Sequence, residues 1–185
     1  MLRFPVRFPA NVNASTPSLR AAALGALCIA DPAAKCSAVA SLDVAGGPCF
    51  HINPVEALLP DSPLPGHPAR PLLVPPQSVP RRSMATVAGR AALIHALAHI
   101  EFNAINLALD MVWRFSGMPA DFYRDWTRVA REEALHFTLL RNHLQTLGHD
   151  YGDFDAHHGL WEMADKTRGD VLARLVLVAR TAEAR

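Results

Sequence analysis

The chain has 185 residues, of which 50% are hydrophobic and 19% charged, and its formal net charge is +1. This length suits one domain with a substantial core, and the composition is ordinary for a globular protein. Proteins dedicated to nucleic acids or anionic membranes carry a basic excess, so the near-zero charge argues against both classes. We also expect no run long enough to cross a bilayer, and hence no membrane partner.

The cysteines indicate where the protein resides. Cys28, Cys36 and Cys49 are odd in number and lack the spacing of a metal site. Free thiols of this kind are typical of a reducing compartment, so we expect a cytoplasmic location. The first 20 residues are basic and contain no acid, as organelle transit peptides do, but their prolines would interrupt an amphipathic helix. We therefore expect a frayed terminus there.

Two helices are predicted in an N-terminal helical segment, residues 1–53. The first follows Thr16, which can cap the free N–H groups of a helix, and Pro17, which suits the first helical position. It continues as far as the Asp-Pro pair that begins at Asp31. A second, shorter helix is predicted at residues 33–42.

A proline-rich stretch, residues 54–82, separates this segment from the rest of the chain. Fourteen of the fifteen prolines stand at or before Pro80, and this density allows neither a helix nor a central strand. We predict an extended strap that lies along a helical bundle, because five of its residues are apolar: Leu58, Leu59, Leu72, Leu73 and Val74. The alternative is a flexible linker, the usual interpretation of a proline-rich composition.

Residues 83–185 are predicted to form a helical bundle. Apolar residues recur there at helical spacing. The predicted helices cover residues 86–115, 120–147, 160–166 and 170–185. Thr86 can cap the first of them, and Gly148 provides a C-terminal stop for the second. The predicted fold class is therefore all-α.

Three glutamates fall on the apolar faces of these helices, where acids are costly. Glu101 shares the stripe of its apolar neighbours three and four residues away. Glu133 does the same on the next helix, where His136 follows one turn later, and Glu183 continues the apolar stripe of the last helix. A buried carboxylate without a partner costs several kcal/mol, and a bound metal ion removes that cost. Carboxylates and imidazole together suit iron or manganese.

The spacing Glu133-x-x-His136 places a carboxylate and an imidazole on adjacent turns, within reach of one ion. Alone, this motif is weak evidence, since it arises by chance. Combined with single inward glutamates on two other helices, Glu101 and Glu183, it is the pattern of di-iron carboxylate bundles. The sequence therefore predicts a metal site made of these four residues.

Other interpretations of the polar residues stay open. A glutamate on a helix is often solvated, or pairs with an arginine such as Arg114 or Arg131. His95 and His99, four residues apart, could bind a metal ion themselves, but their offset from Glu101 favours a hydrogen-bonded role in the core or behind the ligands. For Tyr123, which lies close to the metal-binding helix, packing is predicted.

Four stretches of the chain closely resemble the ferritin-like proteins catalogued as domain of unknown function 455. They are residues 95–119, 122–137, 151–167 and 179–185. The proline-rich strap and the early AAALGAL…DPAAK segment also fit, so the resemblance spans nearly the whole chain. It implies a ferritin-like up-down bundle with a centre of two irons, manganese being the alternative metal. Its ligand positions match Glu101, Glu133, His136 and Glu183.

The resemblance also implies a further helix after the position of Arg185, with a second Glu-x-x-His that this chain lacks. We therefore expect an incomplete bundle with an apolar groove, filled by a second copy of the chain or by a partner chain. The expected function is a di-iron oxidoreductase of the oxygen-activating type, impaired by the missing ligands. The alternatives are a non-catalytic ferritin-like scaffold and an iron storage or detoxification protein. The sequence indicates no substrate or electron donor.

Overall fold

The computed structural model describes residues 17–42, 50–80 and 82–176. Within these residues the secondary structure is helical, with no named strand. The α-helices are α1 (Leu19–Cys28), α2 (Pro32–Ala40), α3 (Val87–Arg114), α4 (Ala120–Thr146), α5 (Gly159–Lys166) and α6 (Val171–Arg174), and η1 (Pro76–Ser78) is a 3₁₀ turn. The predicted all-α class is confirmed for these residues.

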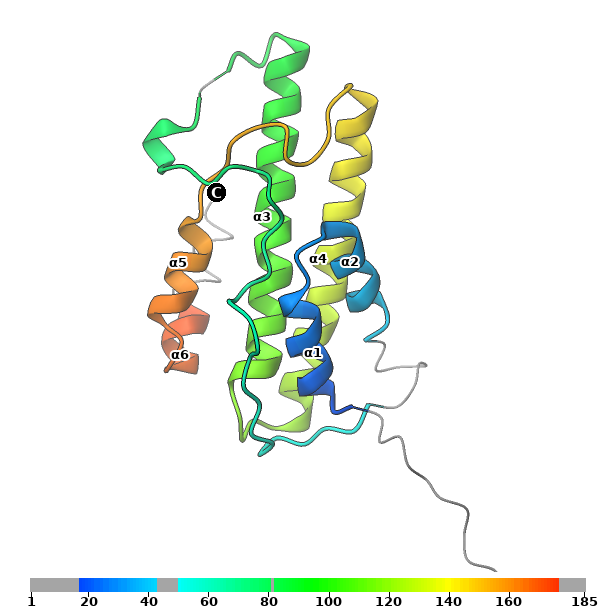
Figure 1. Ribbon diagram of the computed structural model, residues 1–185, viewed down its shortest axis with the longest axis vertical. Coiled ribbons are helices and arrows are strands. Elements are labelled where there is room, and N and C mark those ends of the chain that lie inside the picture. The colour runs from blue at the N-terminus through cyan, green and yellow to red at the C-terminus, as the bar shows by residue number, and fades with distance from the viewer. Residues whose placement is uncertain (1–16, 43–49, 81, 177–185) are drawn as a thin grey trace, which may run out of the picture.

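The long helices α3 and α4 form an antiparallel pair at the centre of the fold (Figure 1). Thr86 caps α3 as predicted, because its Oγ1 accepts a hydrogen bond from the backbone N–H of Gly89. The short connection after α3 turns at Gly117, whose φ is +74°, and such short connections favour antiparallel neighbours. Gly148, with a φ of +80°, follows the end of α4, again as predicted.

The helices α1 and α2 cover one face of this pair, where α1 packs on α3 and α2 packs on α4. The cap of α1 is Ser18, whose hydroxyl accepts from Ala21 N–H, so the prediction of Thr16 as the cap was wrong. Asp31 caps α2 in the same way, and Pro32 occupies its first position. Both helices begin within two residues of their predicted starts.

The strap lies along the bundle, as predicted, and its attachment is largely through the backbone. Gly66 N–H donates to the carbonyl oxygen of Leu27 at 2.9 Å, and Val74 N–H donates to that of Ala156 at 2.8 Å. The apolar residues behind the prediction are only partly buried: Leu58 packs against the core, but Leu59 is 90% exposed. Backbone hydrogen bonds, which no side-chain pattern reveals, therefore hold the strap in place.

Replacing Gly66 by alanine should lower the free energy of unfolding by about 1–3 kcal/mol. A Cβ atom at this position would lie 2.2 Å from the backbone oxygen of Cys28, so the strap would have to move away from α1. Urea denaturation followed by circular dichroism measures the change. The control is Gly25→Ala in α1, where a Cβ meets nothing within 4 Å and the better helix former should be neutral or stabilising. Equal stability of both variants would contradict the tight contact.

A stripe of five buried polar residues runs along α3. Its members recur every three or four residues: His95, His99, Asn103, Asn106 and Asp110. Each hydrogen-bonds to at least one other side chain or backbone group of the protein. We call this set the polar stripe. It carries the largest set of buried polar groups in the described part of the chain.

The two histidines of the polar stripe are hydrogen-bonded core groups, which confirms that interpretation of the sequence. The Nε2 atom of His95 accepts from the N–H of Gly152 at 2.9 Å. The Nε2 atom of His99 lies 3.0 Å from the carbonyl oxygen of His157 and must donate to it, so its Nδ1 accepts from the hydroxyl of Tyr151. Burial lowers the pKa of both histidines to about 4, so both rings are neutral at pH 7.

Asp110, the last residue of the polar stripe, forms an ion pair that attaches α6 to α3. Asp110 is fully buried and accepts from Arg114 one turn away in α3 and from Arg174 of α6. The guanidinium of Arg174 also donates to the hydroxyl of Thr167 and to the carbonyl oxygen of Ala164 at the end of α5. In Figure 1, α5 and α6 accordingly lie beside α3, away from α4. One buried ion pair thus ties α6 to the central helix.

The helix α3 corrects the expectation that no run reaches the length of a membrane span. Among the described residues it is long and apolar enough to cross a bilayer, with a mean hydropathy of 1.3 over an 18-residue window. In the structure 56% of that window is buried, and the core helix of a compact protein passes the same test. Length and apolar character alone therefore do not assign α3 to a membrane.

Candidate metal centre

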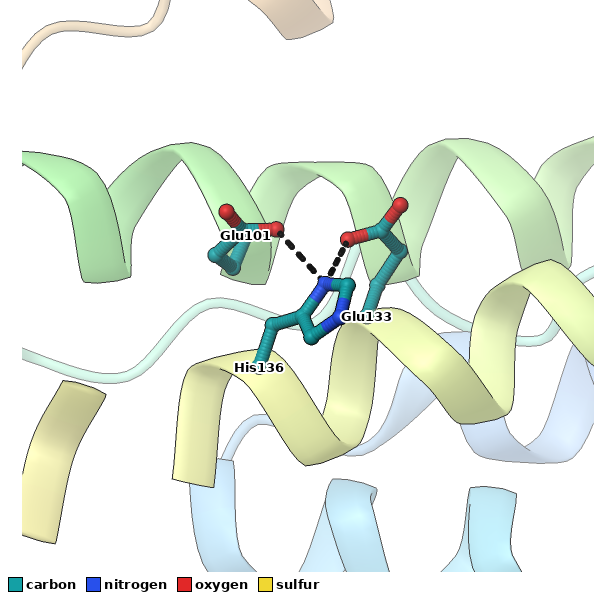
Figure 2. A group of neighbouring side chains, drawn as sticks. All are labelled: Glu101, Glu133 and His136. Carbon is teal, nitrogen blue, oxygen red and sulfur yellow. Dashed lines mark hydrogen bonds and ion pairs between the residues drawn. The ribbon is translucent and has the colours of Figure 1, made fainter. Parts of the chain in front are cut away.

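Three of the four predicted ligands meet between α3 and α4. Glu101 comes from α3, and Glu133 and His136 come from successive turns of α4 (Figure 2). One ligand atom of each lies within 4.8 Å of the others. The Nδ1 atom of His136 is 3.1 Å from a carboxylate oxygen of Glu133 and 3.8 Å from one of Glu101. The spacing Glu-x-x-His thus does place both groups on one face of α4.

Aromatic packing in the core explains why these side chains turn toward one another. Phe102 follows Glu101 in α3, Phe137 follows His136 in α4, and both phenylalanines are almost completely buried. Their ring centroids lie 5.4 Å apart. Because successive residues of a helix point about 100° apart, this contact fixes the rotation of both helices about their axes. It thereby directs the preceding glutamate and histidine to a shared neighbouring face.

The cluster lies at the surface of the helix pair and not deep in the core, which corrects part of the prediction. The side chains of Glu101 and Glu133 are 24% and 23% exposed, and that of His136 is 53% exposed. Both helices also carry exposed leucines: Leu93, Leu97, Leu135 and Leu139. The helices α1 and α2 cover the other side of the pair, so the described residues leave the face of the cluster open.

The two carboxylates of the cluster repel each other when both are ionised. Burial raises the pKa of Glu101 to about 7, and the neighbouring carboxylate of Glu133 acts in the same direction, against a smaller effect of His136. Arg114, one of the arginines considered as a counter-ion, instead binds Asp110. The cluster therefore combines two acids and one imidazole, and a cation placed between them would favour the ionised carboxylates.

The remaining predicted residues are the three cysteines, Tyr123 and the fourth predicted ligand, Glu183. Glu183 lies outside the described residues, as does Cys49, while Cys28 and Cys36 are free thiols. The predicted packing role of Tyr123 is confirmed: the ring is fully buried, and its hydroxyl donates to the carbonyl oxygen of Phe115.

Sequence reasoning missed two features that lie away from the cluster. Lys35 is fully buried and donates to Asn106 of the polar stripe and to the carbonyl oxygen of Leu27. Asn103 lines a small cavity. The sequence does contain a sign of this second packed side, because polar residues recur at helical spacing along α3 and lie off the stripe of Glu101. A second inward-facing stripe means that two sides of the helix are packed.

Comparisons with known proteins agree with the sequence resemblance at the level of the family. Residues 28–185 match the family described as protein of unknown function (DUF455). A protein of Haemophilus influenzae, named uncharacterized protein, is 48% identical over 170 residues, which cover 86% of this chain and 59% of the relative. The chain thus spans about three fifths of the length of the curated relative that it matches. No solved structure matches.

Proposed function

For this chain, which belongs to the DUF455 family, we propose a ferritin-like metal-binding function, with a centre of two irons that serves oxygen-activating oxidation. The observation that carries the proposal is the convergence of Glu101, Glu133 and His136, whose ligand atoms lie within 4.8 Å of one another. Manganese is the alternative metal, since the same oxygen and nitrogen ligands suit it.

The donor set suits a metal ion in its chemistry, and two of its three separations suit one in their dimensions. Oxygen and nitrogen ligands lie about 2.1 Å from ions of this size, so two ligands of one ion are at most about 4.2 Å apart. The separations of 3.1 Å and 3.8 Å from His136 Nδ1 to the two carboxylates already meet that limit. A bound cation would favour the ionised form of Glu101, whose pKa burial raises to about 7.

Further ligands in this proposal come from outside the described residues. Glu183 stands nine residues after Arg174, and Glu101 stands nine residues before Asp110, the partner of Arg174. A helix that ran antiparallel to α3 from this ion pair would bring Glu183 level with Glu101. The other ligands of a dinuclear centre would come from a second copy of the chain, a partner chain or the additional length of the family's longer proteins.

Each residue of the cluster has a defined part in the proposed function. Two bound irons would supply the electrons with which dioxygen is reduced. Glu101 and Glu133 would provide negatively charged oxygen ligands, which offset the positive charge of the bound metal. His136 would provide a neutral nitrogen ligand, and its exposure leaves that side accessible to a substrate.

The decisive experiment measures metal content on protein purified without a chelator. Plasma mass spectrometry should find iron or manganese at close to one or two ions per chain in the wild type, and less than a tenth of that in the Glu133→Ala, His136→Ala double variant. The matched control is Glu132→Ala, His143→Ala, which makes the same two changes at exposed positions of α4 and should keep the metal. Circular dichroism checks that all three proteins are folded.

Two results would contradict the proposal. Folded wild-type protein that takes up neither metal, even with both supplied, would favour a non-catalytic scaffold. Equal metal content in the double variant and in the control would place the metal elsewhere. A cage-sized species on a sizing column, with many irons per chain, would instead favour the storage function.

A further inference from the structure

Tyr151 and His99 form a hydrogen-bonded pair at the central helix. Tyr151 stands in the loop that leads from α4 to α5 beside α3 (Figure 1). Its hydroxyl oxygen lies 2.9 Å from Nδ1 of His99 in α3. Tyr123, the other tyrosine of the chain, donates its hydroxyl to the backbone carbonyl oxygen of Phe115. The two tyrosines therefore differ in their acceptors, because an imidazole nitrogen is a base and an amide carbonyl is a very weak one.

The second nitrogen of the imidazole sets the direction of this hydrogen bond. His99 is only 7% exposed, and its hydrogen-bond partners among the described residues carry no charge, which favours a neutral ring. Its Nε2 atom lies 3.0 Å from the carbonyl oxygen of His157, which can only accept. The ring hydrogen is therefore on Nε2, whichever atom of the Asn103 amide faces the same nitrogen. Nδ1 keeps its lone pair and accepts from Tyr151, whose phenol pKa is raised by burial.

Two phenylalanines connect Tyr151 to the residues of the candidate metal centre. The ring centroid of Tyr151 lies 5.5 Å from that of Phe102 and 5.0 Å from that of Phe137. These phenylalanines directly follow Glu101 and His136 in the sequence. Tyr151 thus packs on the residue next to a predicted ligand in each of the two long helices. Close-packed side chains of this kind allow an electron to pass between groups that do not touch.

We propose that Tyr151 is a one-electron redox residue, whose phenol proton passes to Nδ1 of His99 when the tyrosine is oxidised. The O–H bond of Tyr151 breaks, an N–H bond forms at Nδ1, and one electron leaves the phenol for a one-electron oxidant. The products are a neutral tyrosyl radical and an imidazolium, which donates a hydrogen bond back to the radical oxygen. Return of one electron brings the proton back to oxygen and restores the pair.

The proposed metal centre would be the source of the oxidant, and this part of the inference rests on the proposed function. Tyr151 would pass its electron to a ferric ion there, which becomes ferrous, and would so act as an electron donor within the protein. Tyr123 is unsuited to this role. Its oxidation would leave the proton without a base to accept it, and a positively charged radical in the core is costly.

Light-driven oxidation of the whole chain, treated with a chelator and checked for folding by circular dichroism, tests the redox role without metal. The oxidant is a photo-oxidised ruthenium tris-bipyridine complex with persulfate as its electron acceptor, and electron paramagnetic resonance of frozen samples detects the radical. Ring-deuterated tyrosine should narrow the signal, which shows that the radical is on a tyrosine and not on a tryptophan. The variant Tyr151→Phe should lose this signal, and the control Tyr123→Phe should keep it.

His99→Asn separates proton transfer from hydrogen bonding. The amide oxygen of asparagine can take the place of Nδ1 and accept from Tyr151, but it does not take up the phenol proton. The yield of the radical should fall by about tenfold or more, the effect of losing a hydrogen bond to a charged group. Electron–nuclear double resonance adds a measurement that needs no variant. The wild-type radical should show one strongly coupled proton at its oxygen that exchanges in deuterated water.

Three outcomes would overturn the proposal. The first is the absence of a tyrosyl signal in the folded wild type. The second is a signal that persists in Tyr151→Phe, which would place the radical on Tyr123. The third is an unchanged yield in folded His99→Asn, or a wild-type radical without an exchangeable proton at its oxygen. Because light supplies the oxidant, these results are separate from the metal assay, whose failure would remove only the proposed centre as the acceptor of the electron.

Discussion

Replacement of Asp110 by alanine should lower the free energy of unfolding by about 3–5 kcal/mol, the range seen when one member of a buried ion pair is removed. Both Asp110 and Arg174 are almost inaccessible to solvent, with side chains 0% and 2% exposed. Loss of the aspartate would leave the guanidinium of Arg174 charged in the core. The hydrogen bonds of Arg174 to Thr167 and Ala164 would remain, but they bring no opposite charge.

Urea denaturation measures this effect against a matched control. Asp121→Ala removes an aspartate from an exposed pair with Arg124, whose side chains are 84% and 50% exposed, and should cost less than about 1 kcal/mol. The double variant Asp110→Leu, Arg174→Met should recover much of the loss, because apolar residues of similar volume need no counter-ion. If Asp110→Ala and Asp121→Ala were equally stable, the ion pair would not hold α6 in place.

The free energy of unfolding should rise by about 2–3 kcal/mol between pH 7 and pH 9 because of Lys35. Burial lowers the pKa of this ammonium from 10.5 to about 7 in the folded protein. Over this range the unfolded chain therefore binds a proton that the folded protein does not. Stability then increases with pH by at most about 1.36 kcal/mol per unit. Below pH 7 both states are protonated, and the full cost of burying the charge remains.

The measurement compares urea denaturation at pH 7, 8 and 9 in the wild type and in Lys35→Met, which should lose this slope. The range ends at pH 9 because burial raises the pKa of the Cys36 thiol from 9.0, and its titration would lower stability above that pH. Lys166→Met, a change at an exposed lysine of α5, is the control and should keep the slope. Parallel pH profiles for the wild type and Lys35→Met would show that Lys35 keeps an ordinary pKa.

The helices were predictable because local signals define their ends. Thr86 and Gly148 mark a start and a stop by chemistry that acts within a few residues, and both act as predicted. The attachment of the strap was harder to derive. It depends on backbone groups, such as the N–H of Gly66 donating to Leu27, that have the same identity in every sequence. Pattern analysis therefore predicts the elements better than the way in which a coil segment lies on them.

The sequence predicted which residues form the candidate site better than it predicted how deeply they are buried. Glu133 and His136 share a face because their spacing is intrinsic to a helix, and Glu101 joins them because α3 and α4 are antiparallel neighbours. Periodicity shows which residues share a stripe, but not how many helices cover that stripe, so the 53% exposure of His136 could not be foreseen. The cavity beside Asn103 was equally unpredictable, because a void depends on the shapes of neighbours distant in sequence.

The polar stripe of α3 also has a consequence for the uniqueness of the fold. An apolar helix face can slide by a turn against its neighbours at modest cost, because one methyl group replaces another. Three polar residues of this stripe instead each match one segment: His95 meets the loop after α4, Asn106 meets α2, and Asp110 meets α6. A shift of any segment by one helical turn would leave its polar group buried without a partner, at about 1–3 kcal/mol each. The polar stripe therefore disfavours alternative packings in which α2, α6 or the loop after α4 is displaced along α3.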